Sequence, residues 1–405
     1  MKLTITILLI AMLNFLQTNS FADTNVSAGD DPRVTEIIPN SYAGVTGTGT
    51  FLGPLSNAQR TYQFLIQSSQ LTNVAGKVLT GLSMRIPASA TANWPLADAN
   101  FTNYDIYLSG SVEPSARSLT FANNIVGART QVRSGSLTIL ANSYTFGGSP
   151  NAFGTEIAFN IPWYYAGGNL LIEIRHSGFT GTSRSTDALL STTPGYGTLV
   201  SGCWTGSYTG TSGTQGNFTV VKLSAAEPYS LNLKALIEGR YNNVTDYMKK
   251  DTAKVYLRNS SSPYAIIDSA VSVLDTNGSG IFNYANASNG VNYFIVVKHR
   301  NSINVWSNTG YSFAGNSLSF DFTTAAGQAY GGNLIQKGSR YTIYSGDINQ
   351  DDVIDASDGS DVDNDASLSV SGYVKTDVTG DDFVDAEDVS IVDNNAYNLV
   401  SLVRP

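Results

Sequence analysis

A tandem repeat near the C-terminus constrains this chain more than any other feature. The windows "GDINQDDVIDASD" (346–358) and "TDVTGDDFVDAED" (376–388) lie thirty residues apart and match at most of their aspartates. The match continues as "VDNDA" (362–366) against "VDNNA" (392–396), which indicates a duplicated unit. Side chains that carry oxygen fall at positions 1, 3, 5, 9 and 12 of each window: Asp347, Asn349, Asp351, Asp355 and Asp358, then Asp377, Thr379, Asp381, Asp385 and Asp388.

This spacing is that of an EF-hand-like calcium loop. Calcium is a hard cation that takes about six to eight oxygen ligands, so a short loop must direct several carboxylates inward. Position 7 supplies a backbone carbonyl, here from Val353 and Phe383, and position 12 begins a helix and closes the ligand shell. We therefore predict two calcium sites. We also expect Ile354 and Val384, the apolar residues at position 8, to pair the two loops with each other.

The loops depart from the usual pattern at two positions, and the second departure points to a family. Position 6, usually glycine, is Asp352 and Asp382, and position 12 is aspartate instead of glutamate. Aspartate at position 12, two loops in tandem and a helix after each loop resemble the dockerin domain of bacterial cellulosomes, over about 345–400. The resemblance implies folding on two calcium ions and docking to a cohesin. The Ser-Thr pair typical at positions 10 and 11 is absent from both loops (356–357 and 386–387), so the expected partner is either a cohesin-like protein or the neighbouring part of the chain.

The distribution of charge supports a cation as the ligand. The net charge of −9 is concentrated at the C-terminus, because residues 341–405 hold fifteen acidic residues against Lys375 and Arg404. Such a segment repels nucleic acid and attracts divalent cations. Because its acids also repel one another, we expect the segment to fold only when calcium is bound.

The N-terminus predicts export. Lys2 precedes an apolar run from Ile5 to Leu16, and small residues at Ser20 and Ala22 complete a signal peptide over residues 1–22. A second long apolar run is absent from the sequence, so we expect no membrane span and a secreted or cell-surface location in a bacterium. Cys203 is the single cysteine, which excludes an internal disulfide.

The rest of the sequence predicts a mainly β protein. Residues 23–227 show short alternating strands separated by turn residues, typical of a jelly-roll-like β-sandwich. In "GNLLIEIRHSG" (168–178), for example, Glu173 and Arg175 should lie on the face that is exposed to water. Residues 228–340 resemble the small Ig-like or transthyretin-like spacer modules of exported bacterial proteins, with a turn at "DTNGSG" (275–280). Residues 341–405 would form the α-rich dockerin-like module.

The sequence offers no catalytic motif. His176 and His299 end predicted strands in different domains and are expected at the surface or an edge, and Cys203 is expected to be a buried structural thiol. Aromatic residues at 163–165, 204 and 208 could either stack on sugars or fill the core. The leading hypothesis is therefore a non-catalytic exported protein that uses a calcium-dependent module for assembly or anchoring. The alternatives are a carbohydrate-binding component of a polysaccharide-degrading complex and a glycoside hydrolase, which would need two facing carboxyl groups.

Overall fold

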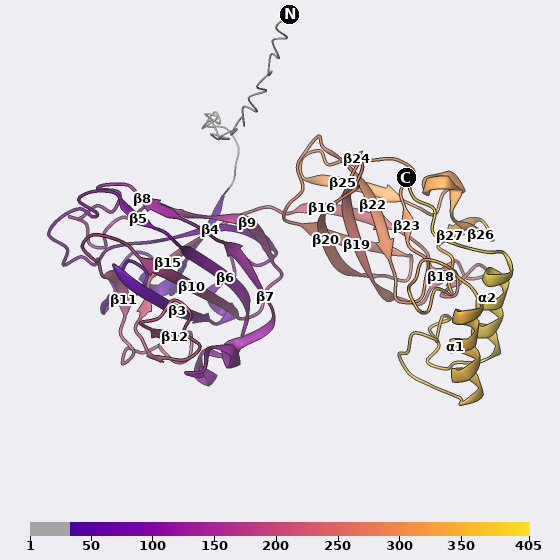
Figure 1. The fold of residues 1–405 in the computed structure, drawn as a ribbon, viewed down its shortest axis with the longest axis horizontal. Coiled ribbons are helices and arrows are strands. Elements are labelled where there is room, and N and C mark those ends of the chain that lie inside the picture. The colour runs from indigo at the N-terminus through magenta and orange to yellow at the C-terminus, as the bar shows by residue number, and fades with distance from the viewer. Residues whose placement is uncertain (1–32) are drawn as a thin grey trace, which may run out of the picture. The chain divides into compact units, whose positions relative to one another are not determined.

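The computed structural model describes residues 33–405, and Figure 1 shows their elements. The predicted signal peptide (1–22) lies outside the described residues, as does the beginning of the first predicted domain. The described chain is mainly β, as predicted, and within it both α-helices, α1 (Ala356–Ser367) and α2 (Ala386–Tyr397), come after residue 355. The predicted domain boundaries at 227 and 340 stay predictions.

Residues 34–226 form antiparallel sheets around one core. The four-stranded sheet has the order β1 (Val34–Ile38), β15 (Val221–Ala226), β4 (Lys77–Met84) and β9 (Ile157–Tyr165). The six-stranded sheet has the order β13 (Thr214–Gln215), β12 (Val200–Thr205), β3 (Ala58–Ile66), β10 (Leu170–Gly178), β6 (Tyr104–Ser111) and β7 (Ile125–Arg133). Smaller sheets join β14 (Phe218–Thr219), β11 (Thr186–Leu189) and β2 (Gly49–Phe51), and β5 (Ala99–Phe101) with β8 (Leu137–Ile139). Alternate apolar residues of both large sheets meet in a single hydrophobic cluster.

Strand β10 shows where the alternation of apolar and polar residues predicts burial correctly and where it does not. Ile172 and Ile174 enter the core, but Glu173, predicted to face water, is 0% exposed. Its Oε1 accepts hydrogen bonds from Arg129 (2.8 Å) and Arg175 (2.6 Å). The prediction was wrong because an earlier segment of the chain, 121–124, covers this face. The carbonyl of Phe121 and the side chain of Asn124 both bond to Gln63, which itself donates to Glu173 (2.7 Å).

Residues 229–342 form a second set of sheets. One sheet has the order β21 (Ser279–Tyr284), β16 (Tyr229–Lys234) and β25 (Ser317–Asp321), with β16 and β25 parallel. Another has the order β20 (Ile266–Leu274), β19 (Asp251–Asn259), β22 (Asn292–Lys298) and β23 (Val305–Trp306), with β24 (Tyr311–Ser312) also paired to β22. Two small hairpins consist of β17 (Tyr241–Asn242) with β18 (Tyr247–Met248), and β26 (Ile335–Lys337) with β27 (Arg340–Thr342).

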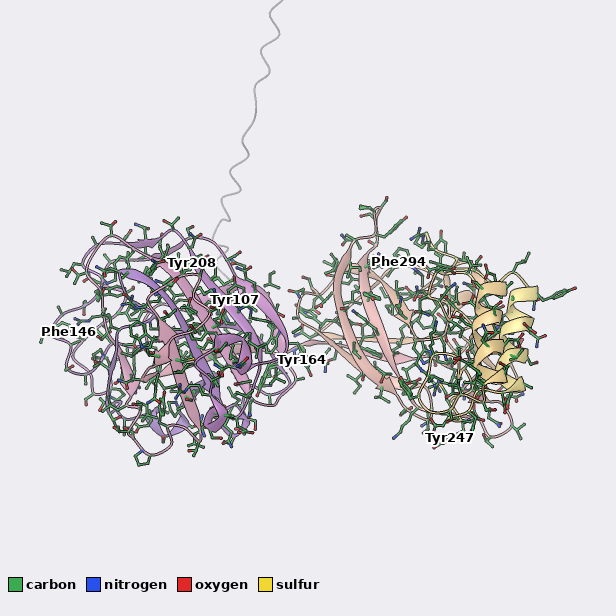
Figure 2. All side chains as sticks on the ribbon, turned by 60° about the horizontal axis from the view of Figure 1, so that its bottom comes forward. Tyr107, Phe146, Tyr164, Tyr208, Tyr247 and Phe294 are labelled. Atoms are coloured by element: carbon green, nitrogen blue, oxygen red, sulfur yellow. The ribbon has the colours of Figure 1, made fainter. Side chains whose placement is uncertain are left out.

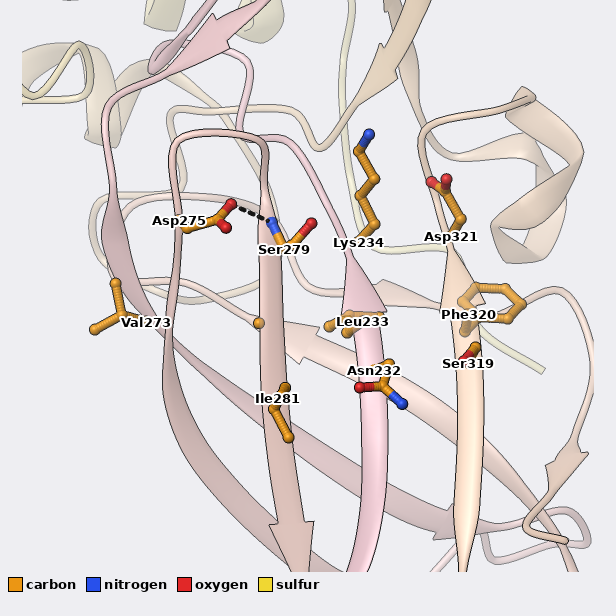
Figure 3. Close-up of a pocket in the computed structure, with 11 residues that line it drawn as sticks. Asn232, Leu233, Lys234, Val273, Asp275, Ser279, Ile281, Ser319, Phe320 and Asp321 are labelled. Atoms are coloured by element: carbon orange, nitrogen blue, oxygen red, sulfur yellow. Dashed lines mark hydrogen bonds between the residues drawn. The ribbon is translucent and has the colours of Figure 1, made fainter.

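The turn expected at 275–280 connects β20 and β21 (Figure 3). Asp275 accepts hydrogen bonds from the backbone N–H groups of Asn277 (2.8 Å) and Ser279 (2.9 Å), and Gly278 adopts a positive φ of 74°. A Cβ at position 278 would lie 2.5 Å from the carbonyl oxygen of Ala235, so glycine is needed here for both conformation and space.

The C-terminal helices do not have a core of their own. Ile348, Val362, Val378 and Val392 belong to the same buried hydrophobic cluster as Leu233 and other residues of the preceding sheets. Helices α1 and α2 pack side by side at this end of the chain (Figure 1). In the described part of the chain, neither helix is long and apolar enough to cross a membrane.

Candidate metal centre

The repeated windows form two loops, which we call the first loop (346–358) and the second loop (376–388). Each loop leads directly into a helix, with position 9 as the N-cap and position 12 in the first turn. In the first loop Asp355 accepts from the N–H of Ser357 (2.7 Å), and Asp358 accepts from the N–H of Asp355 (3.0 Å). This reciprocal capping box satisfies free N–H groups at the start of α1, and Asp385 and Asp388 repeat it for α2.

The carboxylates at positions 1 and 12 organise each loop from inside. Asp358 also accepts from the N–H groups of Ile348 (2.7 Å) and Asn349 (3.1 Å), so one carboxylate connects the start of the loop to the start of the helix. Asp347 accepts from the N–H groups of Asp351 (3.1 Å) and Asp352 (3.3 Å).

The second loop repeats most of these bonds. Asp388 accepts from the N–H of Thr379 (2.9 Å), and Asp377 accepts from those of Gly380, Asp381 and Asp382. All four carboxylates at positions 1 and 12 are at most 1% exposed.

Position 6 shows how the loops turn without their usual glycine. Asp352 and Asp382 adopt φ angles of 71° and 70°, the left-handed region that costs most residues free energy. Asp and Asn visit this region more readily than other side chains do. The same conformation in both repeats shows that the departure from glycine keeps the turn.

The predicted pairing of the two loops through position 8 is wrong. The N–H of Ile354 donates to the carbonyl of Val400 (2.8 Å), which follows α2, and the N–H of Val384 donates to Val370 (2.9 Å), which follows α1. Each loop therefore pairs with the residue that leaves the helix of the other repeat. Because this exchange already uses the backbone N–H at position 8, a direct bridge between Ile354 and Val384 does not form.

The electrostatics of the first loop fit a bound cation. Burial raises the pKa of Asp347 to about 6, and the nearby carboxylate of Asp358 adds to this effect. Burial and Asp377 likewise raise the pKa of Asp388 in the second loop. Two buried carboxylates side by side cannot both ionise cheaply unless a positive charge compensates them.

The donor set also fits calcium, although the two carboxylates at position 5 do not lie inside the loops. Every candidate ligand is a carboxylate, amide, hydroxyl or backbone oxygen, which calcium prefers. Across residues 33–405, however, no three His, Cys, Asp or Glu side chains are gathered as a metal centre. The acids at position 5, Asp351 and Asp381, are exposed and accept from the N–H of Val353 and Phe383 (3.1 Å each). Binding would therefore require these two side chains to turn inward.

Sequence reasoning did not identify the residues that surround the loops. Arg240, Arg300 and Asn304 belong to the preceding β segment yet contact the loops directly. Arg240 and Arg300 lie more than 70 positions before the second loop, and Asn304 lies nearly 50 positions before its partner Asp352 in the first loop. No local sequence pattern could therefore have indicated these contacts.

Three of the aromatic candidates serve the core, and two other candidates form polar contacts outside it. Trp163 and Trp204 pack against the first hydrophobic cluster, and Tyr165 is buried in it. Tyr208, which Figure 2 shows near Tyr107, donates its hydroxyl to Asp105. Glu156 on the predicted strand 154–162, an acid that the sequence places on the outer face, is partly exposed and accepts from Ser224 (2.6 Å).

Both histidines are buried, so the expectation of a surface or edge position was wrong. His176 and His299 are at most 2% exposed and lie beside different hydrophobic clusters. Cys203 is a buried free thiol, and burial raises its pKa to about 12, which keeps it protonated and unreactive.

Comparisons with known proteins assign no family. No protein-family model matches the chain, and no curated protein matches it. Two solved structures, a C-terminal and an N-terminal interface mutant of a type II cohesin-X-dockerin complex from Acetivibrio cellulolyticus, are each 16% identical, with TM-scores of 0.26 and 0.25. They cover 41% and 42% of this chain and 92% of their own chains.

A third similar structure is a beta-glucuronidase from Bifidobacterium dentium complexed with coumarin-3-O-glucuronide. It is 8% identical, covers 69% of this chain and 46% of its own, and has a TM-score of 0.16. Likenesses of this strength do not assign a fold or a family.

Proposed function

We propose that residues 341–405 form a dockerin-like module that binds two calcium ions. The whole protein would be exported and non-catalytic, and would use this module to assemble with a partner or to anchor itself. The observation that carries the proposal is that both loops share hydrogen bonds from the backbone at positions 3 and 5 to buried carboxylates at positions 12 and 1. Calcium, when bound, would add positive charge beside these carboxylates. The ligands would be the oxygens at positions 1, 3, 5, 7, 9 and 12 of each loop.

The remaining parts of the chain fit a display role under this proposal. The sheets of residues 34–226 would be a jelly-roll-like sandwich that binds or presents a ligand, and the next sheets would be an Ig-like spacer. A protein partner such as a cohesin would meet the exposed residues 356–357 and 386–387. Leu368, Tyr397 and Leu399 are 75%, 89% and 82% exposed on the same module, and such apolar side chains are typical of contact surfaces.

Calorimetric titration of the chelator-treated full chain with calcium tests this function. We expect two ions per chain, because each loop carries a complete set of oxygen donors. The double variant Asp347→Ala, Asp377→Ala should bind none, since it removes the buried position 1 carboxylate from both loops. The control Asp363→Ala, Asp393→Ala removes the same charge from exposed helix positions and should still bind two. A wild-type chain that binds no calcium at millimolar concentration would refute the proposal.

A further inference from the structure

We propose that the two loops are unequal, because Arg240 and Arg300 act as built-in counter-ions of the second loop. The second loop would then stay ordered without calcium and bind it weakly, whereas the first loop would depend on calcium and bind it first. This inference rests on the proposed calcium function for the affinities, but its claim about order without calcium can be tested independently.

Arg300 joins the β segment to the second loop through several contacts. Its Nη2 lies 3.8 Å from Oδ2 of Asp377 and donates to the backbone carbonyl of the same residue (3.1 Å). Its Nη1 donates to the carbonyl of Val374, and its guanidinium lies over the ring of Tyr373, 4.1 Å from the centroid. A guanidinium beside a position 1 carboxylate neutralises part of its negative charge, as a bound metal ion would.

Arg240 lies against the same loop from a buried position. Its side chain is 4% exposed, and its Nη1 lies 2.3 Å from where a Cβ at position 380 would be, so the guanidinium packs directly on Gly380. Asp377 is among the charges that act on Arg240. Glycine at position 4 of the second loop therefore leaves the space that a second cation fills.

A single carboxylate, Asp251, positions both arginines. Its Oδ2 lies 2.8 Å from Nη2 of Arg240, 3.1 Å from Nε of Arg300 and 3.1 Å from Nε2 of His299. The hydroxyl of Tyr373 donates to its other oxygen (2.7 Å). Burial lowers the pKa of His299 and keeps this ring neutral, so two guanidinium charges face one carboxylate and one positive charge is left over for the second loop.

The first loop has neutral neighbours at the matching places. Gln350 replaces glycine at position 4 and donates to the carbonyl of Asp347 (2.7 Å), and Asn304 of the β segment donates to Asp352 (2.5 Å). In the described range 33–405, no ion pair reaches a carboxylate of the first loop. The acids of this loop therefore repel one another without compensation.

The charge difference should separate the two binding steps. Like charges within a few ångströms repel strongly in a partly buried site, so the arginines should weaken calcium binding at the second loop by about tenfold or more. The same charges compensate Asp377 when no calcium is bound. The first loop gains both order and charge compensation from the metal alone.

Hydrogen exchange of the wild-type full chain in chelator provides the first test. We expect backbone amides of 376–388 to be protected and those of 346–358 to exchange quickly, with calcium slowing mainly the first loop. This measurement needs no variant. Equal exchange in the two loops, or faster exchange in the second, would overturn the inference even if calcium binding itself is confirmed.

Calorimetry of Arg300→Gln provides the second test. The variant should tighten the weaker calcium step about tenfold and raise exchange of 376–388 in chelator, while the tighter step is unchanged. Arg340→Gln is the matched control, because Arg340, on β27, carries the same charge but pairs with Asp246 away from both loops. If Arg300 serves packing only, its loss would weaken stability equally in calcium and chelator, and the two steps would keep their ratio. A chain that binds no calcium would refute the proposed function, while the exchange comparison would still decide the counter-ion role.

Discussion

At the residue scale, His176 shows how a titratable group can be fixed in one state. Its ring is fully buried and stacks on Tyr104, with 5.4 Å between centroids. Nδ1 accepts from the N–H of Gly178 (3.2 Å), so Nε2 carries the proton and donates to the carbonyl of Gly53 (3.0 Å). A second proton on Nδ1 would break the first bond and place a charge in the core. Burial accordingly lowers the pKa of His176 to about 4.

This residue predicts a loss of stability in acid. The unfolded chain binds a proton at the ordinary pKa of 6.5, whereas the folded chain resists it down to about 4. Stability from this group is therefore complete above pH 6.5 and declines as the pH falls towards 4, by about 3 kcal/mol in total. Denaturant unfolding of wild type and His176→Gln at pH 7, 5.5 and 4 measures it. The variant should be less stable at pH 7 and show a shallower decline, and parallel curves would contradict the assignment.

At the element scale, the helices begin where the loops end because one aspartate serves both. Asp355 and Asp385 have extended backbone and cap α1 and α2, whose first turns contain Asp358 and Asp388. Negative side chains at this end of a helix also interact favourably with its dipole. The sequence thus encodes the helix start and the calcium loop in overlapping residues.

Substitution at position 9 can separate these two roles. In chelator, Asp385→Ala should lower the free energy of unfolding by about 1 kcal/mol, because the N-cap bond to Glu387 is lost in the loop that stays ordered without calcium. Asp385→Ser keeps a capping oxygen and should cost only about a few tenths of a kcal/mol. Urea denaturation of both variants in chelator measures the difference. Equal losses would mean that the cap does not stabilise α2.

At the scale of the whole molecule, the C-terminal module and the preceding sheets share their packing. One hydrophobic cluster extends from Leu231 to Val400, and close backbone contacts join the two segments. Gly239 is the tightest of these, since a Cβ there would lie 2.5 Å from the carbonyl oxygen of Val378.

Gly239→Ala therefore tests whether the two segments unfold together. The added methyl must displace backbone, which should cost about 1–3 kcal/mol of unfolding free energy in calcium and in chelator alike. Gly327→Ala, where nothing lies within 4 Å of the new Cβ, should change stability by less than about 0.5 kcal/mol. By calorimetry we expect the shared cluster of residues 229–405 to unfold in one transition, which shifts only in the first variant and is separate from that of residues 34–226. If residues 229–405 instead unfold in two transitions and the variant shifts only one of them, the segments fold independently.

The sequence by itself determined the local features of this protein. Alternation of apolar residues predicted the mainly β chain, the "DTNGSG" turn needed only nearby Asp and Gly, and the spacing of Asp347 to Asp358 located a loop followed by a helix. Each depends on residues within about a dozen positions of one another, so its physical cause is visible in the order of the chain.

Tertiary structure alone decided what surrounds these features. Glu173 is buried because residues 121–124 of an earlier segment cover it. Ile354 pairs with Val400 instead of Val384 because each loop contacts the residue that follows the helix of the other repeat. The positive charges beside the second loop belong to Arg240 and Arg300, which are too distant in sequence for any repeating pattern to predict the contact. Charge and burial depend on distances in space, and those are fixed only when the sheets and the helices pack into one core.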